Sequence, residues 1–180
     1  GNKSLHLHPL ASDPLQGVDG LINDSVGRAQ SGLSMNPRIL LEGINISVDK
    51  SLLIDAPNGK VDIVNSHLSV SSKNGQPGTL TIAGEEVQID GDSQLLAQGS
   101  KEGGLIQIGG SWQNSDPLVR QATQTIIQSG ALIDASATNK GNGGTIVIWS
   151  DVNNPLGLTK VEGNLISRGG PLGGNGGRIE

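Results

Sequence analysis

The sequence predicts an all-β chain that folds as a parallel β-solenoid, a coil in which successive turns stack their strands. Hydrophobic residues make up 34% of the 180 residues and aromatic residues 1%, which is a poor supply for a conventional globular core. Glycine occurs 28 times without the Gly-X-Y period of collagen. Short runs of alternating apolar and polar residues recur along the chain, as in strands with one buried face. These features favour a narrow, aliphatic and repetitive core.

The repeats fall into two families of short runs. In the first family, apolar residues follow a glycine at every second position: GKVDIV from 59, GTLTIA from 78, GLIQIG from 104, GTIVIW from 144 and GRIE from 177. The second family lies between these runs: SLLIDA from 51, SHLSVSS from 66, EVQIDGDSQLLAQGS from 86, QTIIQSGALIDASA from 124 and KVEGNLISRGG from 160. Asn-Gly, Gly-Asp, Ser-Gly and Gly-Gly pairs mark the corners between runs. The shortest spacing, from 59 to 78, predicts a turn of about 20 residues with two or three strands.

Two segments lengthen particular turns of the predicted coil, 111–121 (SWQNSDPLVRQ) and 150–159 (SDVNNPLGLT). Both contain proline and asparagine, which a central strand does not tolerate, so the sequence predicts inserted loops there. An antiparallel sandwich is the structural alternative, because it also has frequent turns. It does not explain why the glycine runs recur in one phase of a longer unit.

The first 38 residues lack the repeat. The predicted organisation is therefore an N-terminal cap or linker segment, 1–38, followed by a β-solenoid domain, 39–180. Ser12 is a suitable N-cap, Pro14 fits a first helical turn, and apolar residues follow at helix spacing. These residues predict a short amphipathic helix that covers an open end of the coil. An extended linker is the alternative, because glycines interrupt the helical pattern.

The last glycine run is cut short where the sequence ends. This predicts an uncapped edge that is covered by more of a longer polypeptide or by another subunit, and head-to-tail stacking of subunits gives a filament. The candidate self-assembly residues are Arg178, Ile179 and Trp149. Trp149 lies exposed beside the coil if Ile146 and Ile148 point inwards, and it covers the core if they point outwards.

Three segments resemble the repeating portions of filamentous-haemagglutinin-like exoproteins, which are large glycine-rich surface or secreted proteins of Gram-negative bacteria. They are GALIDASA at 130–137, GNGGTIVIWSD at 141–151 and LISRGGPLGGNGGRIE at 165–180. The resemblance is firm over 124–180, diffuse over 39–123 and absent over 1–38. It implies a right-handed parallel β-helix, export by a two-partner system, and adhesion or matrix formation as the role.

One departure from that family concerns its secretion domain, which carries motifs of the Asn-Pro-Asn-Gly type. In this sequence Asn36-Pro37-Arg38 and Pro57-Asn58-Gly59 come nearest to that motif. The resemblance therefore does not assign recognition by an outer-membrane transporter to this chain.

The composition argues against several classes of partner. A net charge of −5 without a cluster of lysine and arginine makes nucleic acid a poor candidate. No apolar run reaches the roughly 18 residues of a membrane span, so membrane insertion is not expected. No cofactor or metal is expected, because the chain lacks cysteine and has three separated histidines. Of the three histidines, His6 and His8 are expected to lie in a solvated tail. Calcium held by loop carboxylates is an alternative.

The candidate binding residues lie in the first predicted loop. Trp112, Gln113 and Arg120 are a mixed group that can stack on a sugar and hydrogen-bond to it, whereas in the alternative Trp112 packs on the flank of the coil. A polysaccharide-cleaving β-helix would need clustered acids. Asp55 and Asp134 follow comparable strand ends and are predicted to stack on one face in that case, although most such aspartates form turns.

The function that the sequence favours is a structural or adhesive module without catalytic activity, outside a Gram-negative bacterium or on its surface. It either self-associates head-to-tail or forms part of a long fibrous surface protein. The alternative is a β-helix that binds or cleaves a cell-surface or matrix polysaccharide.

Overall fold

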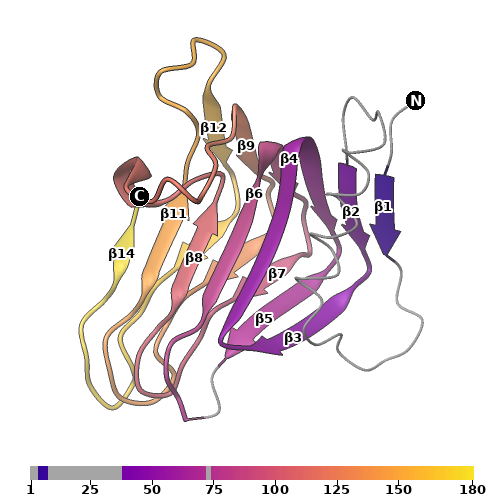
Figure 1. Ribbon diagram of the computed structural model, residues 1–180. Coiled ribbons are helices and arrows are strands. Elements are labelled where there is room, and N and C mark those ends of the chain that lie inside the picture. Colours follow the sequence, from indigo (N-terminus) through magenta and orange to yellow (C-terminus); the bar gives the residue numbers. More distant parts are fainter. Residues whose placement is uncertain (1–3, 8–37, 72–73) are drawn as a thin grey trace.

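The computed structural model describes residues 4–7, 38–71 and 74–180, and over these residues the chain is all-β with parallel sheets (Figure 1). The larger sheet has the order β1 (Ser4–Leu7), β2 (Arg38–Glu42), β4 (Ser51–Val64), β6 (Thr79–Ile89), β8 (Leu105–Ile108), β11 (Thr145–Ile148) and β14 (Arg178–Ile179), with β9 (Gln124–Ile127) paired to β6 and β12 (Leu158–Val161) paired to β9. The smaller sheet has the order β13 (Asn164–Ile166), β10 (Leu132–Asp134), β7 (Gln94–Leu96), β5 (His67–Ser71) and β3 (Asn45–Asp49). The predicted all-β class with parallel sheets is confirmed.

No helix in the described part of the chain is both long and apolar enough to cross a membrane.

The strand register shows that the chain returns repeatedly to the same position in the larger sheet. Arg38 lies beside Lys60, Lys60 beside Glu86, Glu86 beside Gln124, and Gln124 beside Leu158. The strands of the smaller sheet stack in the same chain order, from β3 to β13. We call the stacked segments tiers, from the first to the fifth: 38–56, 60–84, 86–108, 124–148 and 158–179. This arrangement is consistent with the predicted β-solenoid.

β4 joins two runs that the sequence presents as separate strands. Its register with β6 shifts between Ala56 and Lys60, and within that interval Asn58 has a φ of 56°. Asparagine adopts this left-handed conformation more readily than most residues with a side chain. The chain can therefore turn a corner at Asn58 and pass from the first tier to the second within one strand.

The core consists of ladders in which an aliphatic residue of one tier stacks on that of the next. In the smaller sheet Ile46, Leu68, Leu95 and Ile133 form one ladder, and all four are fully buried. Full burial of such a side chain contributes about 1.5–3 kcal/mol relative to exposure. Repeated stacking of aliphatic residues thus builds a core in a chain without phenylalanine or tyrosine.

Glycines at the corner between the smaller and the larger sheet let the tiers approach closely. A Cβ atom on Gly144 would overlap the carbonyl oxygen of Gly104, and one on Gly177 would overlap that of Gly144. In the GNGG motif, Gly141 needs glycine for a second reason, since its φ is 149°. The motif is a corner of the stack, where a Cβ atom at the glycine positions would overlap the backbone of the neighbouring tier.

Both predicted inserted loops lie between strands of the larger sheet. The first, 111–121, connects β8 to β9 and contains the 3-10 turn η1 (Trp112–Asn114). The second is shorter than predicted, because Leu158 and Thr159 already belong to β12.

The two loops share a local turn. In the first loop the N–H of Leu118 donates to Oδ1 of Asp116 at 2.9 Å, and in the second the N–H of Leu156 donates to Oδ1 of Asn154 at the same distance. A proline lies between the two residues in both cases, so each tip is an Asx-Pro-Leu turn. These turns explain why the chain leaves the sheet at both places.

The N-terminal segment contributes a strand that the sequence did not predict. β1 pairs in parallel with β2, and the backbone of His6 lies beside Leu40. The backbone of His6 therefore belongs to a paired strand and not to a free tail. The run SLHL alternates apolar and polar residues, and β2 offers an edge with which it can pair. The helix predicted from Ser12 lies outside the described residues.

Candidate functional site

The fifth tier presents an open edge. β12 pairs with β9, β13 with β10 and β14 with β11, and none of the three has a second partner among the strands that the structure describes. The outer side of each strand therefore carries backbone N–H and C=O groups without a strand opposite them. Figure 1 shows β12 and β14 at the orange and yellow end of the stack, away from β1. We call β12, β13 and β14 the C-terminal edge.

Apolar residues of the C-terminal edge are exposed at ladder positions that are buried in earlier tiers. Ile179 continues the ladder of Ile146 and is 48% exposed, whereas Ile146 is fully buried. Val161 continues the ladder of Ile127 and is 40% exposed, whereas Ile127 is fully buried. Near the other end of the stack, Ile39 in β2 is fully buried, and β1 pairs with the outer side of β2. The apolar ladders of the larger sheet therefore end in exposed residues at β12 and β14.

Two of the three candidate self-assembly residues lie on this edge. Arg178 and Ile179 form β14, and the guanidinium carbon of Arg178 lies 4.5 Å from the centroid of the Trp112 ring. This distance is within the range of a cation–π contact. The structure thus brings a predicted self-assembly residue and a predicted binding residue together.

Trp149 lies directly after β11, one strand in from β14 of the C-terminal edge. Ile146 and Ile148 point into the core, as one of the two sequence alternatives requires. The ring is nevertheless half-buried: its Nε1–H donates to Oε1 of Gln121 at 2.9 Å, and a Cβ on Gly110 would lie 2.8 Å from its Cγ. The expectation of an exposed Trp149 is wrong, because the first inserted loop begins and ends beside the ring.

The structure separates the three predicted binding residues. Trp112 and Gln113 lie beside β14, where the Gln113 backbone N–H donates to Oε2 of Glu180 at 2.8 Å. Arg120 reaches β4 instead, where its Nε and Nη2 donate to Oδ1 and Oδ2 of Asp55 at 2.6 and 3.1 Å. β6, β8 and β11 lie between these two strands, a separation of about 19 Å at roughly 4.8 Å per strand. Arg120 therefore does not join Trp112 and Gln113 in one site.

Three side chains that point away from the core are buried in the strands between those two anchors. Thr81, Gln107 and Val147 form one column, and each lies between core residues of its strand, so it faces outwards. None of them is more than 8% exposed, and Nε2 of Gln107 donates to Oγ1 of Thr81 at 3.0 Å. The first inserted loop is anchored on either side of this column, at β4 and at β14.

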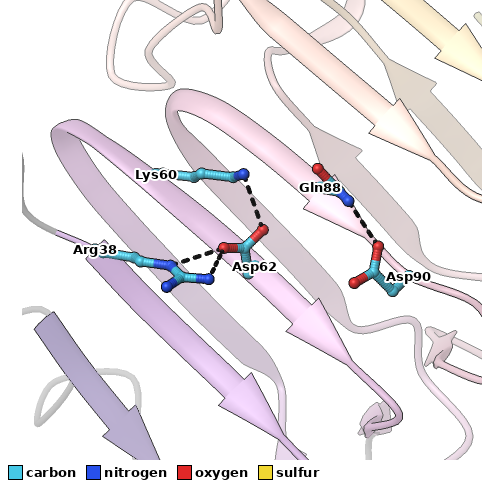
Figure 2. Close-up of polar contacts among 5 residues, drawn as sticks. All are labelled: Arg38, Lys60, Asp62, Gln88 and Asp90. Atoms are coloured by element: carbon cyan, nitrogen blue, oxygen red, sulfur yellow. Dashed lines mark hydrogen bonds and ion pairs between the residues drawn. The ribbon is translucent and has the colours of Figure 1, made fainter.

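A polar cluster on the larger sheet holds a buried carboxylate (Figure 2). The Asp62 side chain is 5% exposed; its Oδ2 accepts hydrogen bonds from Nε and Nη2 of Arg38 at 2.8 and 2.6 Å, and its Oδ1 lies 3.4 Å from Nζ of Lys60. In the next tier Gln88 donates to Asp90 at 2.8 Å. Two cations compensate the charge of Asp62, so its oxygens are engaged in an internal ion-pair network.

The predicted stacking of Asp55 and Asp134 on one face is wrong. Asp55 lies in β4 of the larger sheet and Asp134 in β10 of the smaller one. The oxygens of Asp134 accept hydrogen bonds from the Ser136 N–H at 2.8 Å and from Nε2 of Gln98 at 2.9 Å. Similar strand-end sequences thus occur on both sheets, which the repeat pattern does not distinguish. The two residues do not form the carboxylate pair that polysaccharide hydrolysis needs.

A polar groove of about 500 Å³ follows the glycine corner from tier to tier. Its walls include Thr79, Thr145, Asn142 and Asn175, and the Asn175 N–H donates to Oδ1 of Asn142 at 2.8 Å. The lining also includes the charged residues Glu102 and Arg178, so the groove offers neutral and charged hydrogen-bonding groups to a hydroxylated ligand. Within the described ranges, no group of three or more His, Asp and Glu side chains is placed to hold a metal ion.

Several contributors to this region were not predicted. Val161 had a usable signal, since it belongs to an alternating run, but its exposure follows from the position of its strand at the edge. Glu180 and Gln121 gave no sequence signal, because their partners are far away in the chain.

Comparison with protein-family models and with curated proteins gave no match to this chain.

Proposed function

We propose that this chain is a structural module of an extracellular fibrous protein, folded as a right-handed parallel β-solenoid whose C-terminal edge is covered by a further parallel tier. The exposure of that edge carries the proposal. Ile179 and Val161 extend fully buried ladders, yet they are 48% and 40% exposed, on strands with unpaired backbone groups. An edge of this kind recruits another β-strand.

The repeated register supports the solenoid form. Each tier contributes strands to both sheets and stacks on the tier before it. Crossover connections between parallel strands of one sheet are right-handed in about 98% of cases, which supports the handedness.

The resemblance of 124–180 to filamentous-haemagglutinin-like exoproteins supports the extracellular location and the structural or adhesive role. The engagement of Asp62 and Asp134 by internal donors supports a module without catalytic activity, because the oxygens of both carboxylates already accept hydrogen bonds within the chain.

A further tier of the same polypeptide is the occupant of the edge that we favour. It continues the ladders without rearrangement. A second copy stacked head-to-tail must instead pair with β1 and β3, the outermost described strands at the other end of the stack. Self-association of the isolated chain through the same edge remains expected, because the edge is then uncovered.

The experiment compares the 180-residue chain with the variant Val161→Lys/Ile179→Lys by light scattering and electron microscopy over a wide concentration range. The wild type is expected to associate and the variant to stay monomeric, because each lysine places a charge at an apolar ladder position. Leu118→Lys, at a loop tip that is 93% exposed, is the control and should associate like the wild type. A wild type that is monomeric at every concentration, or association that persists in the edge variant, contradicts the proposal.

A polysaccharide-binding role is the second candidate, and the groove along the glycine corner favours it. Thr79, Asn142 and Asn175 offer hydrogen-bonding groups from the second, fourth and fifth tiers. A screen against immobilised glycans tests it, with Asn142→Ala expected to reduce binding. Glycan binding that is unchanged in Asn142→Ala and Thr79→Ala rules out this groove as the site.

A further inference from the structure

The first inserted loop, 111–121, contacts both β4 and β14, which are not neighbours in the larger sheet. In a stacked repeat each tier normally contacts only its neighbours, so stability is set by the interfaces between adjacent tiers. A tier at an open edge is then the first to fray, because it is paired on one side. A segment that joins distant tiers changes this behaviour.

At β4 the loop is anchored by a bidentate ion pair. Nε and Nη2 of Arg120 donate to the two oxygens of Asp55 at 2.6 and 3.1 Å. The side chains are 39% and 23% exposed, so the pair is partly shielded from water. Two parallel charge-assisted hydrogen bonds fix the orientation of the loop as well as its position.

At β14 the loop is anchored by two consecutive residues. The Trp112 ring lies under the guanidinium of Arg178, at 4.5 Å, and the Gln113 N–H donates to the Glu180 carboxylate at 2.8 Å. The Glu180 N–H in turn donates to the carbonyl of Ile146 at 2.9 Å, so Glu180 continues the pairing of β14 with β11. The loop therefore contacts both Arg178 and Glu180, the charged residues on either side of the ladder residue Ile179.

Between its anchors the loop has internal order. The Asp116 N–H donates to Oγ of Ser111 at 3.0 Å. Gln113 and Asn114 have φ values of 48° and 52°, and two successive non-glycine residues in this conformation persist only where surrounding contacts hold them. The loop therefore has a defined conformation between its two anchors.

We infer that residues 111–121 form a strap that couples the first tier to the fifth, so that the tiers between them open as one unit and the C-terminal edge stays ordered. The buried outward-facing column of Thr81, Gln107 and Val147 lies in the strands between the two anchors of the strap. The strap acts within one chain and does not depend on what covers the edge.

Amide hydrogen exchange of the 180-residue chain, at a concentration at which it is monomeric, tests the coupling. Asp55→Asn and Arg120→Gln release the anchor at β4. They are expected to speed exchange of the Arg178 and Glu180 amides, four strand positions away, by about three- to tenfold, because the edge is then held only by β11. Glu162→Gln is the control: it removes the exposed Lys160–Glu162 pair in the fifth tier and should leave those amides unchanged.

The reciprocal variant keeps the test decisive if a change at Asp55 disturbs folding. Trp112→Leu loosens the anchor at β14 and is expected to speed exchange over 51–56, since coupling between two sites acts in both directions. Circular dichroism confirms that each variant keeps its β-structure. Changes confined to the residues beside each substitution, with the opposite anchor unaffected, overturn the strap.

Discussion

Arg120 holds both carboxylate oxygens of Asp55 although 65 positions separate the two residues in the sequence. This contact ties the end of an inserted loop to the first tier. Arg120→Ala is expected to lower the free energy of unfolding by about 1 kcal/mol, because a bidentate, partly buried ion pair exceeds the usual value of an exposed pair. Urea denaturation measures the change.

The matched comparison for Arg120 is Lys160, whose ion pair with Glu162 has both side chains roughly half exposed, at 56% and 45%. Lys160→Ala should change stability by no more than about 0.5 kcal/mol. Arg120→Lys should recover part of the lost stability, because an ammonium group keeps the charge but not the fork geometry. Equal losses of stability for Arg120→Ala and Lys160→Ala would show that the Arg120–Asp55 pair stabilises the chain no more than the exposed Lys160–Glu162 pair does.

Close stacking at the glycine corner gives a second prediction. Gly144→Ala is expected to destabilise the chain by about 1–3 kcal/mol, because the new Cβ overlaps the carbonyl oxygen of Gly104 and the tiers must move apart. Gly176→Ala is the control, since its Cβ would lie 3.7 Å from its nearest neighbour, the carbonyl oxygen of Ser167. That variant should be neutral or slightly stabilising, by up to about 1 kcal/mol, through the unfolded chain. Thermal unfolding of the two variants distinguishes these outcomes.

The fold was predictable because its signals are local. Alternating runs after glycines gave the strands, and proline with asparagine gave the two loops. The sequence separated 51–56 from 59–64, whereas the structure joins them in β4, because Asn58 can turn the corner without leaving the sheet. β1 was missed because a four-residue run carries little pattern and forms a strand only when an edge is present to pair with it.

The candidate site was less predictable because its contacts are between tiers. Trp112, Gln113 and Arg120 are close in sequence, but the loop that carries them spans the sheet and places Arg120 on β4. Asp55 and Asp134 have similar local sequences and lie in different sheets. The number of residues in each turn decides such partners, and insertions of different lengths change that number from tier to tier.

The buried carboxylate of Asp62 gives a third prediction. Asp62→Ala is expected to cost about 1–3 kcal/mol, because it leaves Arg38 and Lys60 close together without the anion between them. Asp62→Leu should cost no more than Asp62→Ala, since an apolar side chain fills the same space. Chemical denaturation measures both variants. If Asp62→Ala leaves the free energy of unfolding unchanged, the side chains of Arg38 and Lys60 move into solvent when the carboxylate is removed.

The ladder of the larger sheet gives the last prediction, which links packing to assembly. Ile146→Ala should destabilise the isolated chain by about 2–5 kcal/mol, because Ile146 is fully buried, whereas Ile179→Ala at the next position should cost under about 1 kcal/mol at 48% exposure. When a further tier covers the edge, Ile179 becomes an internal ladder position and the cost of Ile179→Ala should rise toward that of Ile146→Ala. Measuring both variants below and above the concentration at which the chain associates tests this. A cost for Ile179→Ala that stays constant across association would show that assembly leaves the ladder uncovered.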